Sequence, residues 1–166
     1  AWQFAKAQHV ADAGGWTRFV AMQNHYNLLY REEEREMIPQ CADMGVGILP
    51  WSPLARGLLT RPVENRKSTS RGASDQMTAK WFSHENDEVI RVVDEIAAAR
   101  NTSMAQVALG WLLSKVEVTA PIVGATKLAH LDDAIAAAEI ELSEDEIERL
   151  ETPYNAPFDD KHPFLG

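Results

Sequence analysis

The sequence predicts an α/β protein with parallel strands. Three short apolar runs, at 19–23, 46–51 and 118–123, have the length and composition of buried strands, and helical patterns separate them along the chain. This alternation is typical of parallel sheets, because parallel strands need a crossover connection and a helix usually supplies it. We therefore expect three parallel strands that are adjacent in the sheet, with helices packed on one side.

The first half of the chain contains two of these strands and two expected helices. Residues 2–13 are expected to form a helix because Phe4, Ala7 and Ala11 share one helical face. Residues 31–44 are expected to form a single charged helix, which a glycine ends.

A long irregular stretch and an amphipathic helix follow. Residues 52–83 are rich in Arg, Ser, Thr and Gly, and loops of this length are usually functional or disordered. Residues 87–100 place Val89, Val93 and Ile96 on one face, which predicts a helix packed against a core.

The last third of the chain carries two capping-box patterns. Ser103 with Gln106 and Ser143 with Glu146 each pair an N-cap hydroxyl with a side chain three residues later, which predicts a helix start. Between the two, residues 128–138 also have a helical pattern. Helices therefore flank the third expected strand on both sides.

Composition excludes several classes of protein. The chain has 166 residues, 45% of them apolar, with a formal net charge of −9, whereas a nucleic-acid partner requires a basic face. No apolar run reaches the roughly 18 residues of a membrane span, and the first residues lack the layout of a signal peptide, so we expect a cytoplasmic protein with no membrane partner. Cys41 is the single cysteine, so no disulfide and no metal site is predicted.

Three motifs stand at the carboxyl ends of the expected strands: Gln-Asn-His-Tyr-Asn at 23–27, Trp-Ser-Pro-Leu-Ala-Arg-Gly at 51–57, and Gly-Ala-Thr-Lys at 124–127. With the helix pattern at 105–112, they resemble the aldo-keto reductases, in the bacterial branch that also resembles the β-subunits of potassium channels. The resemblance implies that residues 1–166 form one domain, the NADP-binding C-terminal part of a (β/α)8 TIM barrel. Periodicity alone leaves a small open three-layer α/β domain as the alternative.

The resemblance assigns the nicotinamide end of the cofactor to two residues. Ligands of a parallel barrel bind where the strand carboxyl ends open, so the Trp51 ring can stack on a planar nicotinamide. Gln23 offers both a donor and an acceptor to the carboxamide. Plain core packing is the alternative for Trp51.

The resemblance also implies a pyrophosphate site. Ser52, Leu54 and Gly57 match positions that line the pyrophosphate in the family, where backbone N–H groups and a hydroxyl suit phosphate oxygens. Arg71, in the long loop, resembles an arginine that closes over the cofactor. The alternatives are an ordinary Ser-Pro turn and a solvated surface charge.

The third motif is expected to bind the adenosine end of the cofactor. Gly124, Thr126 and Lys127 open a helix, whose free N–H groups and positive dipole end attract phosphate. A hydroxyl and an ammonium beside a 2′-phosphate favour NADPH over NADH. His130 and Asp133 stand where the family has a glutamine and a glutamate that contact adenine. An ordinary capped helix is the alternative.

The resemblance implies an NADP(H)-dependent oxidoreductase that reduces small aldehydes and ketones. Its catalytic Asp, Tyr, Lys and His come from the first half of the family's barrel, so we name no catalytic residue here and expect residues 1–166 alone to be an inactive fragment. The alternative is a stand-alone nucleotide-binding or regulatory half-barrel. Open sheet edges, with an apolar face that includes Val20, Met22, Ile48 and Ile122, predict self-association.

Overall fold

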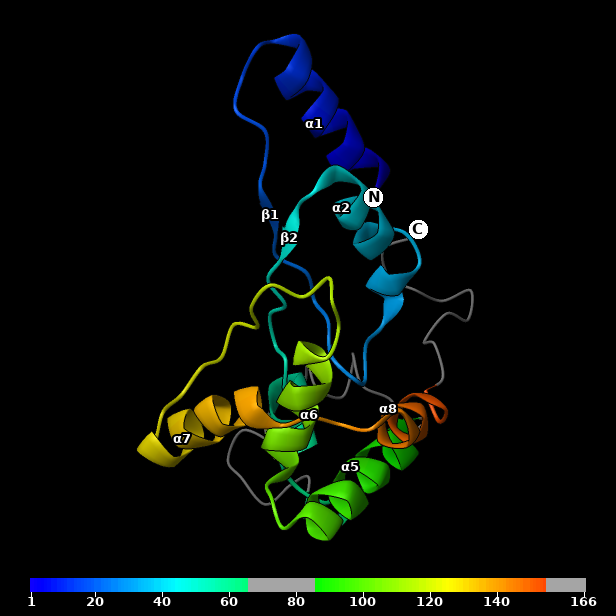
Figure 1. The fold of residues 1–166 in the computed structure, drawn as a ribbon, viewed down its shortest axis with the longest axis vertical. Coiled ribbons are helices and arrows are strands. Elements are labelled where there is room, and N and C mark those ends of the chain that lie inside the picture. The colour runs from blue at the N-terminus through cyan, green and yellow to red at the C-terminus, as the bar shows by residue number, and fades with distance from the viewer. Residues whose placement is uncertain (66–85, 155–166) are drawn as a thin grey trace.

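The computed structural model describes residues 1–65 and 86–154 as a helix-rich α/β structure with a partial parallel sheet (Figure 1). Its strands are β1 (Ala21–Met22) and β2 (Gly47–Ile48). The α-helices are α1 (Trp2–Ala13), α2 (Met37–Met44), α5 (Asp87–Arg100), α6 (Met104–Leu113), α7 (Leu128–Ala136) and α8 (Glu144–Glu151). Short 3-10 helices are η1 (Glu32–Glu34), η2 (Ala55–Thr60), η3 (Val63–Asn65) and η5 (Ala137–Glu139).

The sheet confirms the expected parallel pairing but is smaller than predicted. β1 pairs with β2 in parallel, with Ala21 opposite Gly47 and Met22 opposite Ile48. A single parallel bridge, between His25 and Trp51, extends this pairing beyond the two strands.

The prediction of a full third strand at 118–123 is wrong. This segment runs beside β2 and makes one parallel bridge, from Val118 to Ile48. The Thr119 hydroxyl accepts the Ile48 N–H at 3.2 Å, which occupies a donor that a ladder would use. Pro121 has no N–H to donate, so the ladder is interrupted there, although the Ile122 N–H donates to the Pro50 carbonyl at 2.8 Å.

The expected helix over 31–44 is divided into η1 and α2. Pro39 lies in the first turn of α2, where its missing N–H costs nothing. If α2 extended toward the N-terminus through η1, residue 39 would have to donate its N–H to the carbonyl of Arg35. Pro39 has no N–H, so α2 does not include η1. In contrast, α1 and α5 have the predicted bounds.

The two predicted capping boxes have different outcomes. At α8 both halves form, because Ser143 Oγ accepts the Glu146 N–H at 3.3 Å and Glu146 Oε2 accepts the Ser143 N–H at 2.8 Å. At α6 only the first half is confirmed, since Ser103 Oγ accepts the Gln106 N–H at 3.2 Å. The Gln106 side chain turns instead to Asp133 on α7.

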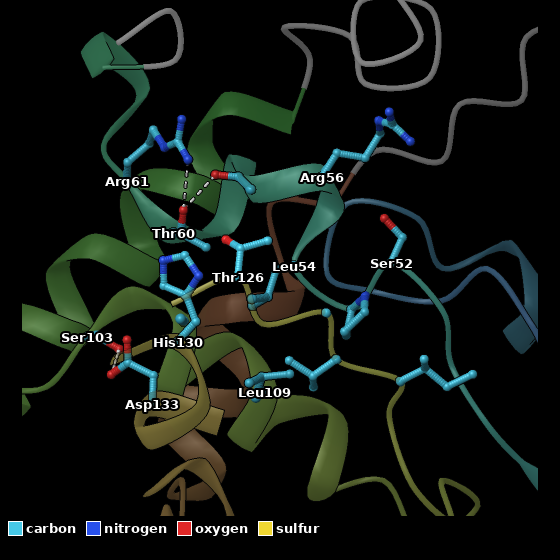
Figure 2. A pocket seen from close by; sticks show the side chains of 16 residues that line it. Ser52, Leu54, Arg56, Thr60, Arg61, Ser103, Leu109, Thr126, His130 and Asp133 are labelled. Atoms are coloured by element: carbon cyan, nitrogen blue, oxygen red, sulfur yellow. Dashed lines mark hydrogen bonds between the residues drawn. The ribbon is translucent and has the colours of Figure 1, made fainter. Parts of the chain in front are cut away.

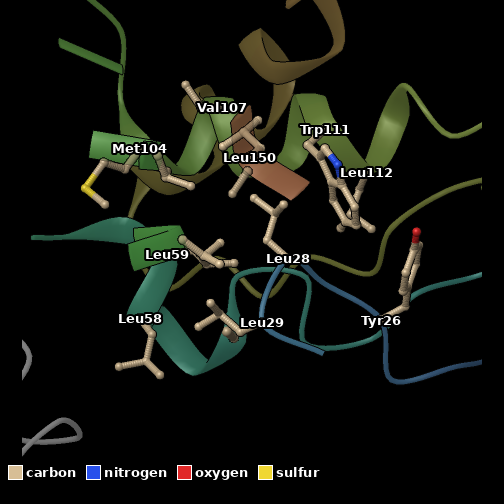
Figure 3. Close-up of a cluster of buried hydrophobic side chains, with 14 of the residues drawn as sticks. Tyr26, Leu28, Leu29, Leu58, Leu59, Met104, Val107, Trp111, Leu112 and Leu150 are labelled. Carbon is tan, nitrogen blue, oxygen red and sulfur yellow. The ribbon is translucent and has the colours of Figure 1, made fainter. Parts of the chain in front are cut away.

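The hydrophobic core lies between α5, α6, α8 and the turn that follows β1 (Figure 3). Leu28 and Leu29, from that turn, meet Trp111 and Leu112 of α6 and Leu150 of α8, and all five are almost completely buried. The turn that follows the first motif is therefore fixed by side chains from the far end of the chain.

Arg31 ties the same turn to α8 through polar contacts. Its guanidinium makes two hydrogen bonds of 2.9 Å to Glu34 and one of 3.0 Å to Glu151. Its backbone N–H donates to the Tyr154 hydroxyl at 2.9 Å. Glu151 also accepts the Trp111 indole N–H at 2.9 Å, so the network joins the turn, α6 and α8.

Part of the expected apolar face is exposed. Val20 is 75% exposed and Ile122 is 42% exposed, while Met22 is half-buried. The expectation that Ile48 belongs to an exposed apolar face is wrong, because its side chain is completely buried between β1 and the segment that follows α6. Self-association through open edges stays a prediction. Within the described ranges, no helix is long and apolar enough to span a bilayer.

Candidate functional site

A cavity of about 510 Å³ opens beyond the carboxyl end of β2, between η2 and the first turns of α6 and α7 (Figure 2). Its lining combines small, hydroxyl and charged side chains with a few aliphatic ones. The lining residues are Ser52, Pro53, Leu54, Arg56, Gly57, Thr60, Arg61, Ser103, Ala105, Leu109, Ile122, Val123, Gly124, Thr126, His130 and Asp133.

Most of the site residues expected from the sequence lie around this cavity. The lining includes Ser52, Leu54, Gly57, Gly124, Thr126, His130 and Asp133. Three others, Gln23, Trp51 and Lys127, are not part of it, and Arg71 lies outside the described residues. The structure therefore brings the second and third motifs together from distant parts of the chain.

The backbone of the second motif is strained where it forms the cavity wall. Ser52, Ala55 and Arg56 have φ values of 54°, 47° and 56°, in the left-handed region that side chains disfavour. Gly57 follows at φ 94°, where a side chain would be strained. Such strain is found mainly at functional sites, and successive N–H groups in mixed-handed turns form concave anion sites.

Basic and hydroxyl groups face the cavity from η2. Arg56 and Arg61 line it, and Arg61 donates to the Thr60 hydroxyl at 3.3 Å. That hydroxyl donates to the Gly57 carbonyl at 2.8 Å, which closes the turn. Arginine is well suited to phosphate groups, so this wall fits an anionic ligand. Arg56 and Thr60 were not among the site residues expected from the sequence, although Arg56 belongs to the second motif and Thr60 follows it closely.

The third motif leads into α7 as expected. Lys127 is the N-cap residue, with extended backbone, and its side chain makes no cap hydrogen bond. An added Cβ at Gly124 would meet no atom within 4 Å, so the backbone there faces open space. Gly124 and Thr126 thus leave room for a ligand near the start of α7.

Asp133 is held in the cavity wall by α6. Its Oδ1 accepts a hydrogen bond from Ser103 Oγ at 3.0 Å (Figure 2). It accepts a second from Gln106 Nε2 at 2.7 Å. The carboxylate of α7 is therefore oriented before any ligand binds. Sequence reasoning assigned Ser103 and Gln106 to a helix cap alone, and only their spatial meeting with Asp133 reveals this second role.

Trp51 stacks on His25, which belongs to the first motif. Their ring centroids are 4.2 Å apart with an interplanar angle of 19°. The other face of His25 stacks on Tyr30 at 4.4 Å and 24°. Burial, with a smaller effect of the Arg56 charge, lowers the pKa of His25 from 6.5 to about 4. Gln23, in contrast, is exposed at the end of β1.

This pKa predicts how stability depends on pH. Unfolded His25 takes up a proton near pH 6.5 and folded His25 only near pH 4, so its contribution is present above pH 6.5 and is lost as pH falls through that window. The expected loss is about 3 kcal/mol of unfolding free energy by pH 4. Chemical denaturation at several pH values should show this loss in the unaltered chain and not in His25→Phe. A matching pH slope in both proteins contradicts the prediction.

None of the three tyrosines is suited to donate a proton at neutral pH. Burial and the hydrogen bond to Glu34 raise the pKa of Tyr26, and burial raises that of Tyr30. Burial also raises the pKa of Tyr154 to about 12. A catalytic phenol requires the opposite shift.

Parallel strands with a phosphate-compatible cavity at their carboxyl ends define the class of α/β barrel proteins that bind ligands at this face. The family model of the aldo/keto reductase family matches residues 1–154, and the chain belongs to this family. The fold is accordingly part of a (β/α)8 barrel, which confirms the family and fold expected from the sequence.

Several fungal proteins are similar to the chain. A Schizosaccharomyces pombe protein named for aryl-alcohol dehydrogenase is 49% identical over 92% of the chain and 43% of its own length. Aldo-keto reductase AMT2 of Alternaria alternata is 45% identical over 93% of the chain and 41% of its own length. Versiconal hemiacetal acetate reductase of Aspergillus parasiticus is 44% identical over 93% of the chain and 46% of its own length. The chain thus spans less than half the length of these relatives.

Proposed function

We propose that the chain supplies the cofactor-binding half of an NADP(H)-dependent oxidoreductase that reduces aldehydes or ketones to alcohols. The observation that carries the proposal is the cavity beyond β2, where the second and third motifs meet. Membership of the aldo/keto reductase family supports the reaction class.

The strained turn and its arginines are suited to hold the pyrophosphate. The Ser52 hydroxyl and the guanidinium groups of Arg56 and Arg61 supply donors and positive charge on one wall. The bound cofactor supplies the hydride, and the protein orients it.

The two ends of the cofactor are assigned to different residues. His130 and the fixed carboxylate of Asp133 are suited to contact adenine, since both line the cavity. Trp51 and Gln23 are assigned to the nicotinamide, at the carboxyl ends of the strands. Trp51 immediately precedes Ser52, the first lining residue.

Substitution of Lys127 tests the proposed preference for NADPH over NADH. Its ammonium, at the start of α7, is proposed to contact the 2′-phosphate together with the Thr126 hydroxyl. Lys127→Ala is expected to weaken NADPH binding by about 1–3 kcal/mol and to leave NADH binding almost unchanged. Titration by calorimetry measures both.

Lys6→Ala is the matched control, because Lys6 is an exposed lysine on α1 and does not line the cavity. It should alter neither affinity. Equal losses for the two cofactors in Lys127→Ala rule out a contact with the 2′-phosphate.

Aromatic carbonyl compounds are the proposed substrates. One relative is named for aryl-alcohol dehydrogenase, and another for the reduction of versiconal hemiacetal acetate. Small aromatic aldehydes are therefore the first substrates to assay in a protein that contains both halves of the barrel.

A nucleotide-binding module without catalysis is the second candidate. The raised pKa values of Tyr26, Tyr30 and Tyr154 favour it, because these phenols are poor proton donors. Sequencing the gene upstream discriminates the two. Coding sequence with Asp, Tyr, Lys and His at the family's spacing supports the oxidoreductase, and its absence supports the module.

A further inference from the structure

Three aromatic rings form one continuous stack beside the cavity. His25 lies between Tyr30 and Trp51, with centroid distances of 4.4 Å and 4.2 Å and interplanar angles of 24° and 19°. His25 also forms the parallel bridge to Trp51, so backbone pairing and ring stacking act on the same two residues. One face of the Trp51 indole is therefore covered by imidazole.

Asn27 fixes this stack to the strained turn. Its side chain is completely buried, and Nδ2 donates to the Ser52 carbonyl at 3.0 Å. The same nitrogen lies 3.3 Å from His25 Nε2. An amide nitrogen only donates, so Nε2 accepts and carries no proton. The amide orientation is itself fixed, because Oδ1 accepts the Leu29 N–H at 2.9 Å.

We propose that His25 is a positioning residue, whose imidazole, backed by Tyr30 and held by Asn27, fixes the plane of the Trp51 indole as a platform for the nicotinamide ring. The inference rests on the proposed function. It adds His25, a residue of the first motif that the resemblance does not assign to cofactor binding. An indole held in one orientation loses less side-chain freedom when the ligand binds. A neutral imidazole also adds no charge behind the positively charged ring of oxidised cofactor.

The test compares two ligands of residues 1–166. NADPH contains the nicotinamide, whereas 2′,5′-ADP contains only the adenosine end with its 2′-phosphate. His25→Ala is expected to weaken NADPH binding about tenfold and to change 2′,5′-ADP binding less than about twofold. His25→Phe retains a flat ring and should restore most of the NADPH affinity.

His9→Ala is the matched control, since His9 is an exposed histidine on α1. It should change neither affinity. Equal losses for both ligands in His25→Ala indicate general damage to the fold and overturn the inference. If the unaltered chain binds neither ligand, the proposed function fails and the inference fails with it. If the unaltered chain binds 2′,5′-ADP as tightly as NADPH, the nicotinamide platform is refuted, while binding of the adenosine end of the cofactor is retained.

A spectroscopic measurement tests the stack without any ligand. NMR of the unaltered chain should show the His25 ring protons shifted upfield by the flanking rings. Trp51→Leu should reduce that shift. Ring protons at ordinary positions, unaffected by Trp51→Leu, mean that the rings do not stack, and this also overturns the inference.

Discussion

Trp111→Ala is expected to lower the unfolding free energy of residues 1–166 by about 3–5 kcal/mol. Trp111 is completely buried in α6 and belongs to the hydrophobic core cluster. Its ring lies 5.4 Å from the Tyr26 ring and 5.6 Å from the Arg31 guanidinium carbon, so truncation removes contacts on several sides. The cavity left behind adds to the lost apolar transfer energy.

A second variant separates the ring from its hydrogen bond. Trp111→Phe keeps an aromatic ring but removes the N–H that donates to Glu151 at 2.9 Å. We expect it to cost about 1–2 kcal/mol, because Glu151 retains Arg31 and Lys115 as partners. Chemical denaturation measures both variants.

Trp2→Ala is the matched control for these substitutions. Trp2 is 68% exposed on α1, so its loss should change the unfolding free energy by no more than about 0.5 kcal/mol. A Trp111→Ala protein as stable as the Trp2→Ala protein refutes the assignment of the core.

Residues 1–166 alone are expected to give no protein-dependent oxidation of NADPH with a reactive aromatic aldehyde. Hydride transfer to a carbonyl requires a group that protonates the developing alkoxide. The three tyrosines have raised pKa values, and the Tyr26 hydroxyl donates to Glu34. The lowered pKa of His25, about 4, makes its imidazole neutral at pH 7, so it is not available as a cationic acid.

Absorbance at the NADPH band measures this prediction, with a full-length aldo-keto reductase as the positive control. A rate that rises in proportion to the concentration of residues 1–166 contradicts it. Trp51→Leu distinguishes such a rate from contamination, because a contaminating enzyme is unaffected by the substitution.

The helices and the family follow from the sequence itself. The periodicity of apolar residues gives the bounds of α1 and α5, and the Ser143–Glu146 box opens α8 as expected. These signals are local, since they depend on residues within one or two turns of each other. The three motifs likewise identify the aldo/keto reductase family without any knowledge of contacts.

The site itself depends on contacts between distant residues, and only the tertiary structure decides these. The third strand is lost because Thr119 takes the Ile48 N–H, a contact across 71 positions in the sequence. Gln106 leaves its own helix start for Asp133 on α7. His25 becomes a neutral ring because Tyr30 and Trp51 enclose it. Each outcome is a competition between a local partner and a distant one, and the sequence does not show which lies within reach.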